Sequence, residues 1–176
     1  MSQSILISAT LLTCAALSFA GNPQSPAADT SVTIGGKTIS IKYSAPSLRG
    51  RQMFSPDGRI SKDPNYPVWR AGADEATALH TDADLNIAGL NVPKGDYTVF
   101  VLINVKPWQL IINKQTKQWG LEYHADQDLG RVPMNISKPS APIETFKITL
   151  LRKGGNGGEL KMEWENVIAT VPFTVK

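Results

Sequence analysis

The sequence predicts an all-β protein, an antiparallel β-sandwich of jelly-roll or immunoglobulin-like form with about ten short strands. Three observations predict this fold class. Apolar and polar residues alternate over long stretches, as they do in strands with one buried face. Fourteen Gly and twelve Pro are spread along the chain as turn signals rather than clustered. No segment after the first twenty residues has the apolar spacing of an amphipathic helix, so no substantial helix is expected there.

A Gly35-Gly36 turn is expected to join the first two strands. Apolar and polar residues alternate on both sides of this turn, which indicates a hairpin of 32–34 with 38–43. Residues 44–67 follow and contain four prolines without any periodicity. A structureless stretch of this length is unusual in a compact domain and is often functional.

The longest apolar run outside the N-terminal segment is 97–103, which has turn residues at both ends. Its β-branched and aromatic residues indicate a strand buried on both faces. We expect residues 119–123 to pair back onto a strand at 108–113. The last third predicts three alternating strands, with the glycine-rich stretch 154–158 as a hairpin turn.

The first twenty residues are uncharged and mostly apolar, and they end in Ser18-Phe19-Ala20. A short apolar run with small residues before a cleavage point is typical of a secretory signal peptide. Cys14 would be the acylated residue of a lipoprotein, but the residue before it fits a lipidation motif poorly. The sequence therefore predicts an exported protein, periplasmic or secreted, with a signal peptide at 1–20, a flexible leader at 21–31 and one β-sandwich domain at 32–176.

Composition removes several classes of function. The net charge is +3, and the nearest approach to a basic run is Arg49-Gly50-Arg51, so nucleic-acid binding is not expected. Cys14 is the single cysteine, and removal of the signal peptide would exclude disulfides, thiol catalysis and cysteine-bound metals. No transmembrane segment is expected in the mature chain, and no cofactor is expected.

Each of the two histidines begins a short segment in which an aspartate follows two residues later. The pairs are His80 with Asp82 and His124 with Asp126. On a strand such residues share a face, so two facing segments would form a divalent-metal site. Aspartate is a poor strand former, however, and the interpretation we favour is that both segments are solvated strand ends.

Residues 68–77 hold the densest mixture of chemical groups. Arg70 and Glu75 lie beside apolar Trp69 and are separated by a bend that contains Gly72. We expect them to pair with each other, or with other charges such as Asp128 and Arg131, at a partly buried point. A ligand-anchoring arginine and acid–base chemistry are the alternatives. Trp69 and Trp119 are candidate aromatic contacts, although core or rim packing is commoner for a tryptophan in a small sandwich.

Several sequence motifs occur in order between Ile39 and the C-terminus: 43–51, 68–77, 93–97, 118–120, 128–131 and 163–165. Through these motifs the chain resembles a bacterial exported family known as domain of unknown function 2911. The resemblance implies no established activity, cofactor or catalytic residue. It does single out six polar residues as site candidates: Arg49, Arg51, Arg70, Glu75, Asp128 and Arg131.

The function class favoured is an exported binding or interaction module of the cell envelope. Its partner would be a small ligand or an envelope component of unknown identity. The alternative is a cell-envelope enzyme, hydrolase-like, with a charged cleft around Arg70 and Glu75. An enzyme needs convergent ionisable groups in a pocket, whereas a binding module needs exposed aromatic side chains or a free sheet edge.

Overall fold

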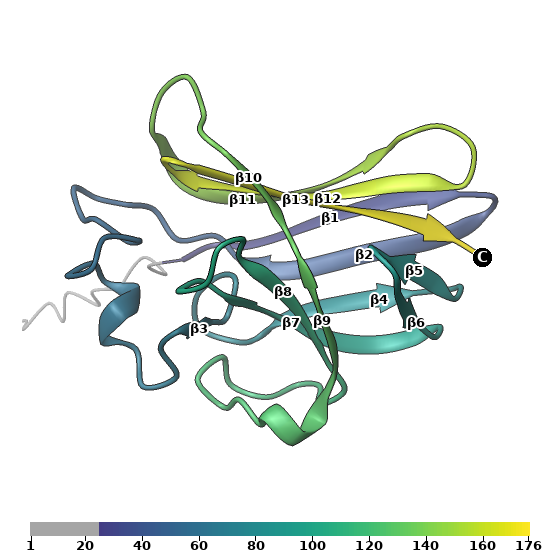
Figure 1. Ribbon diagram of the computed structural model, residues 1–176, viewed down its shortest axis with the longest axis horizontal. Helices are drawn as coiled ribbons and strands as arrows, with labels where there is room; N and C mark the ends of the chain where they lie inside the picture. Colours follow the sequence, from purple (N-terminus) through teal and green to yellow (C-terminus); the bar gives the residue numbers. More distant parts are fainter. Residues whose placement is uncertain (1–24) are drawn as a thin grey trace, which may run out of the picture.

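The computed structural model describes residues 25–176, and the predicted signal peptide at 1–20 lies outside the described residues. Two antiparallel sheets face each other in this part of the chain, so the predicted β-sandwich is confirmed (Figure 1). The described residues form thirteen strands rather than about ten, because several turns bound strands of only two or three residues. The helical content is two single-turn 3-10 segments, η1 (Ile60–Lys62) and η2 (Ala125–Gln127).

The first sheet has seven strands. They are β1 (Ala27–Ile34), β2 (Lys37–Ser44), β3 (Val68–Trp69), β4 (Thr77–Thr81), β7 (Gly95–Leu102), β8 (Gln109–Asn113) and β9 (Asp128–Pro133). Their order is β1-β2-β4-β7-β8-β9, and β3 pairs with the end of β7 that β4 does not reach.

The second sheet has six strands. They are β5 (Leu85–Ile87), β6 (Leu90–Val92), β10 (Asn135–Ser137), β11 (Ile143–Arg152), β12 (Gly157–Glu165) and β13 (Val167–Val175). Their order is β11-β12-β13-β5-β6, with β10 also paired to β13. The chain passes from β9 in the first sheet directly to β10 in the second, and Figure 1 shows this long crossing strand in front of the sandwich.

Strand β1 begins at Ala27, inside the segment expected to be a flexible leader. It pairs with β2 along its whole length, from Ala27 opposite Ser44 to Ile34 opposite Lys37. The predicted Gly35-Gly36 turn is confirmed, since both glycines have positive φ (58° and 75°) and join the two strands. The Pro, Ala and Ser content suggested a leader, but ladder hydrogen bonds to β2 override that weak local preference.

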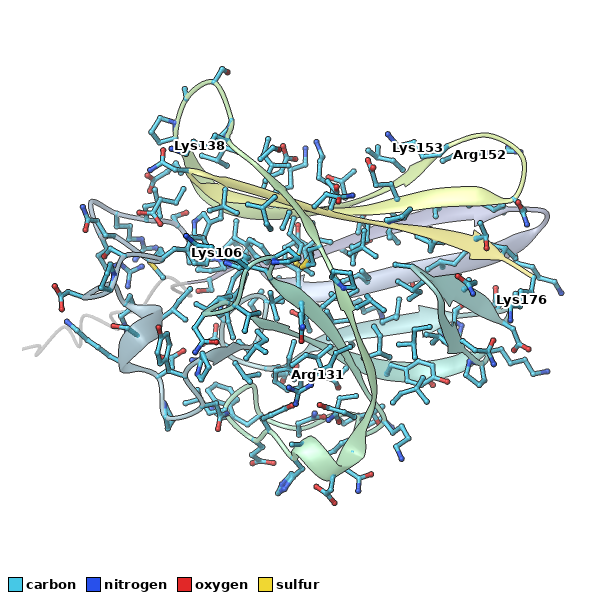
Figure 2. All side chains as sticks on the ribbon, viewed as in Figure 1. Lys106, Arg131, Lys138, Arg152, Lys153 and Lys176 are labelled. Carbon is cyan, nitrogen blue, oxygen red and sulfur yellow. The ribbon has the colours of Figure 1, made fainter. Side chains whose placement is uncertain are left out.

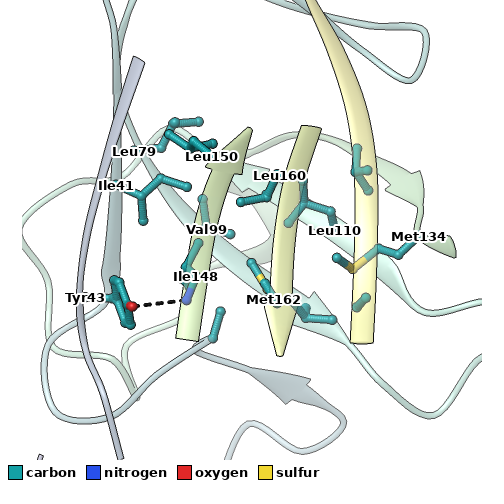
Figure 3. Close-up of a cluster of buried hydrophobic side chains, with 14 of the residues drawn as sticks. Ile41, Tyr43, Leu79, Val99, Leu110, Met134, Ile148, Leu150, Leu160 and Met162 are labelled. Carbon is teal, nitrogen blue, oxygen red and sulfur yellow. Dashed lines mark hydrogen bonds between the residues drawn. The ribbon is translucent and has the colours of Figure 1, made fainter. Parts of the chain in front are cut away.

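The main core lies between the two sheets and contains the inward residues of the predicted alternation. Figure 3 shows side chains of both sheets meeting there, among them Leu79 and Val99 from the first sheet and Leu160 and Met162 from the second. The strands β11, β12 and β13 bury every second residue, as the sequence predicts.

The outer edge of β11 has no paired strand ladder, but residues of β1, β2 and the segment after β2 bond to it. The amide of Ile148 donates to the Tyr43 hydroxyl at 3.0 Å (Figure 3), and the amide of Leu150 donates to the Thr30 hydroxyl at 3.2 Å. The amide of Phe146 donates to the carbonyl of Pro46 at 2.8 Å. Three successive outward amides of this edge strand are therefore satisfied.

Strand β7 is buried on both faces, as its apolar run predicts. Its inward face belongs to the main core, while Phe100 on the outward face joins Val68 and Ile111 in a second, smaller cluster. Residues 114–127, here named the covering loop, lie over this cluster through Tyr123, whose ring centroid is 4.9 Å from that of Phe100. The expected pairing of 119–123 with β8 is wrong, because β9 takes the position beside β8 and the covering loop arches over the sheet face instead.

Two small gaps lie between the sheets, of about 10 and about 20 Å³. Apolar and aromatic side chains line both, among them Trp69 and Trp164 for the first and Leu79 and Phe173 for the second. Gaps of this size hold about one water at most, and their walls are almost entirely apolar. Within residues 25–176, no helix has the length and apolarity needed to cross a membrane.

Candidate functional site

Arg70 lies under the covering loop and pairs with Asp63. The guanidinium Nη2 is 3.0 Å from Asp63 Oδ2, and the two side chains are only 13% and 10% exposed. Asp63 also accepts a longer contact, 3.4 Å, from Arg59 Nη1 at the solvent side. The ion pair is therefore mostly buried, and this single charge-assisted hydrogen bond helps to fix the position of the arginine.

The expected pair of Arg70 with Glu75 is not formed, and neither residue pairs with Asp128 or Arg131. Ala71 and Asp74, which lie between Arg70 and Glu75 in the sequence, both have positive φ (50° and 57°). The backbone therefore changes direction at each of these two residues. Glu75 is consequently turned outward, where its backbone forms an isolated bridge with Trp119. Its carboxylate is exposed and makes no hydrogen bond or ion pair with the described residues.

Gly120 is the point where Arg70 and the covering loop meet. A Cβ on Gly120 would lie 2.5 Å from Arg70 Cδ and 2.5 Å from the Asp74 carbonyl oxygen, so only glycine fits here. The Gly120 amide donates to that same carbonyl at 2.9 Å. One residue further on, the Leu121 carbonyl accepts a 2.6 Å hydrogen bond from Asn65 Nδ2. The chain segment 63–70 thus holds the covering loop from one side.

Asp128 and Arg131 hold the same loop from the other side, through Tyr123. Arg131 Nη2 donates to Asp128 Oδ2 at 2.8 Å and to the Tyr123 hydroxyl at 2.8 Å, and that hydroxyl donates to Asp128 Oδ2 at 2.7 Å. Asn113 Nδ2 completes the network with bonds to Asp128 Oδ1 and to the His124 carbonyl. Figure 2 shows Arg131 where β9 passes the covering loop.

The pKa values of this network do not suit acid–base chemistry at neutral pH. Burial, followed by the hydrogen bond to Asp128, raises the pKa of Tyr123 to about 12. The hydrogen bond to Asp128 raises the pKa of Arg131 above its usual value. Both groups therefore keep their protons, and the network functions as a fixed support for the loop.

Trp119 is the residue that this support presents to solvent. The amide of Ala76 donates to the Gln118 carbonyl at 3.2 Å, and the amide of Glu122 donates to the Trp119 carbonyl at 2.8 Å. Gln118 points inward and is buried beside Thr98, at 3.2 Å between Oε1 and Oγ1. The Trp119 side chain is nevertheless 47% exposed. The backbone on both sides of this indole is fixed while the ring remains free to contact a partner.

The remaining motif candidates lie away from the covering loop. Arg51 donates to the carbonyls of Leu48 and Ser47 at 2.9 and 2.8 Å, and the Arg49 amide donates to Glu144 Oε1 at 2.8 Å. Both arginines therefore help to shape the loop before η1. Trp69 is buried in the main core, where it stacks on Trp164 at 5.8 Å between ring centroids. It is a packing residue and not an exposed aromatic contact.

The structure separates the two histidine segments. His80 lies on β4, with Nδ1 2.7 Å from Asp96 Oδ1 and Nε2 3.1 Å from Asp82 Oδ1. His124 and Asp126 lie in the covering loop, at the start of η2. Within the described residues, no three His, Cys, Asp or Glu side chains are placed to hold a metal ion. The weak metal candidates His80, Asp82, His124 and Asp126 are thus not assembled into one ligand set.

His80 gives a pH-dependent prediction. The hydrogen bond to Asp96, and then that to Asp82, raises the pKa of His80 above 6.5 in the folded protein. The protonated His80 side chain therefore adds to the free energy of unfolding. This contribution is fully present below the pKa of His80 in the unfolded chain, and it is lost as the pH rises through the higher pKa of the folded protein. We expect His80→Gln to lower the free energy of unfolding at about pH 5.5 and to have almost no effect at about pH 8.5. Urea unfolding at both pH values measures this, and His124→Gln, on an imidazole without a side-chain bond to the described residues, is the control.

The fold and these contacts define a class of protein: an antiparallel β-sandwich that carries a firmly held surface loop with an exposed tryptophan. The chain belongs to the family described as protein of unknown function (DUF2911), whose model matches residues 25–173. No match is found among curated proteins or among solved structures. The family match confirms the resemblance given by the motif strings, and all six polar candidates fall inside the matched range.

Sequence reasoning missed several residues that hold the covering loop, among them Asp63, Asn65, Asn113 and Tyr123. Asp63 and Asn65 lie in the irregular stretch 44–67, in which no periodicity or motif marks them. The strand predicted at 119–123 included Tyr123, but its side chain returns to Asp128.

Proposed function

We propose that this protein is an exported binding module of the cell envelope, periplasmic or secreted, whose contact surface is built around Trp119. One observation supports it most: four of the motif polar or glycine residues, Arg70, Gly120, Asp128 and Arg131, fix the covering loop, and that loop exposes an indole. An exposed aromatic ring on a preorganised backbone loses little conformational entropy on binding. Intact mass of the protein from its own host, starting at Gly21, tests the export.

A binding module has more support than the alternative of a hydrolase-like enzyme. The charged cleft considered for that enzyme required Arg70 and Glu75 to converge, and Arg70 is instead occupied by Asp63. Tyr123, Asp128 and Arg131 are bonded to one another. Trp119 and the exposed carboxylates beside it are the groups that this surface would offer to a partner.

Trp119→Ala tests the proposed surface. We expect this variant to lose at least about tenfold in affinity for insoluble cell-envelope material from its own host, as a central aromatic contact would. The measurement is a sedimentation binding isotherm. Ile136→Ala is the matched control, since Ile136 is 43% exposed but lies on β10 in the other sheet. Equal loss in both variants, or none in Trp119→Ala, contradicts the proposal.

A further inference from the structure

We infer that the ligand of the Trp119 surface is an uncharged polysaccharide, bound across two aromatic rings, Trp119 and Tyr66. This inference rests on the proposed function and specifies its ligand class. Tyr66 and Trp119 are two of the three exposed large hydrophobic side chains among the described residues. The third, Ile136, is on the opposite sheet.

Tyr66 and Trp119 lie on chain segments that are bonded to each other. Asn65, next to Tyr66, donates to the Leu121 carbonyl, and Arg70 packs against Gly120, next to Trp119. The pair of Arg70 with Asp63 lies within the first segment and joins its two ends. Both segments lie below β3 at the lower left of Figure 1. The two rings are therefore displayed by a single corner of the molecule.

The shape of this corner favours a polymer over an enclosed small molecule. The two gaps described above are apolar, lie between the sheets and are not lined by Tyr66 or Trp119. A small ligand usually needs a concave site that buries most of its surface. A polysaccharide instead lies along an open surface and places the C–H faces of its sugar rings on aromatic side chains. The hydroxyl edges of the rings then need hydrogen-bond partners beside the aromatic groups.

The polar groups at this corner fit sugar hydroxyls better than a charged polymer. Asp74, Glu75 and Glu122 are all exposed, and each is joined to Trp119 or Gly120 through the backbone. A carboxylate accepts charge-assisted hydrogen bonds from hydroxyl groups. Two exposed lysines, Lys114 and Lys117, lie in the covering loop, so this surface carries charges of both signs. Mixed charges give no strong net attraction for a polyanion, single-stranded nucleic acids included, or for a polycation, whereas both signs hydrogen-bond to neutral hydroxyl groups.

The test uses the full-length mature chain and a panel of insoluble polysaccharides. Cellulose, chitin, mannan and starch are the uncharged probes, and cross-linked alginate is the anionic probe. We expect retention on at least one uncharged probe and none on alginate. On the retained probe, Trp119→Ala should bind at least about tenfold more weakly, Tyr66→Ala several-fold more weakly, and Ile136→Ala like the wild type. Thermal unfolding of each variant confirms that the fold is intact.

Acrylamide quenching of tryptophan fluorescence gives an independent readout. Trp69 and Trp164 are buried and Trp108 is partly buried, so a Trp108→Phe background assigns the quenchable signal to the exposed Trp119. A bound soluble oligosaccharide of the retained type should protect it, and Trp119→Phe should remove the protected component.

Two results would contradict an uncharged polysaccharide as the ligand while leaving the proposed binding function in place. The first is that none of the uncharged probes retains the protein. The second is that the protein binds envelope material through Trp119, but no longer does so after that material has been treated with protease. The second result would assign the surface to a protein partner. Wild-type binding of Trp119→Ala to envelope material would instead overturn the proposed function itself, and with it the inference.

Discussion

Asp63→Ala should destabilise the protein by about 3 kcal/mol, because it leaves the Arg70 guanidinium buried without a counter-charge. Arg70 is 13% exposed and has no second acidic partner among the described residues. In addition, Arg70 packs against Gly120, so its movement toward solvent would disturb the covering loop. Equilibrium urea unfolding, with the slope checked for two-state behaviour, measures the loss.

A double-mutant cycle separates the ion pair from other effects of the substitution. Adding Arg70→Met to Asp63→Ala removes the uncompensated charge and keeps most of the apolar stem, so the double variant should recover part of the lost stability. Glu75→Ala is the control and should stay within about 0.5 kcal/mol of the wild type, since its carboxylate is exposed. If Asp63→Ala unfolds like Glu75→Ala, the pair has no structural role.

Gly120→Ala should both destabilise the protein and disturb the Trp119 surface. The added methyl group would meet a backbone oxygen, that of Asp74, at 2.5 Å, and a backbone atom cannot rotate away. Overpacking of this kind costs about 1–3 kcal/mol. The relaxation available is a shift of the covering loop, which carries Trp119 with it. We expect stronger acrylamide quenching of Trp119 and weaker binding to envelope material.

Gly35→Ala is the matched control for this effect. Gly35 has a φ of +58° but open space around its Cβ position, so an alanine there costs about 1 kcal/mol through backbone conformation alone. Its binding and quenching should equal those of the wild type, because the β1–β2 turn is not part of the Trp119 surface. Unchanged quenching and binding in Gly120→Ala would show that the loop position does not depend on this close contact.

The fold was predictable wherever one face of a strand is buried. The alternation in β11, β12 and β13 and the apolar run of β7 are read directly from the chain, since burial on one or two faces imposes the pattern. The covering loop was not predictable, because Trp119 and Tyr123 have strand-forming side chains. Their position over the outer face depends on long-range contacts with Asn65 and Arg131.

The motif strings name polar residues but not their partners. Arg70, Asp128 and Arg131, which these strings single out, each form an ion pair, and their part in a site stays a prediction. The strings gave Glu75 as the partner of Arg70 because the two are near in sequence. The positive φ values of Ala71 and Asp74 reverse the chain between them, and no pattern in the sequence marks a non-glycine residue for that conformation.

The hydroxyl groups of Tyr43 and Thr30 have a consequence for solubility. An edge strand with unpaired amides is a template on which a second molecule can add its own strand. On β11 the outward amides of Ile148 and Leu150 are already bonded to these two side chains, and that of Phe146 to Pro46. A second chain approaching this edge would find no free donors at these three positions. Residues 146–150 of this edge are thus protected from edge-to-edge pairing by two side-chain hydroxyls and one carbonyl, without a proline within the strand.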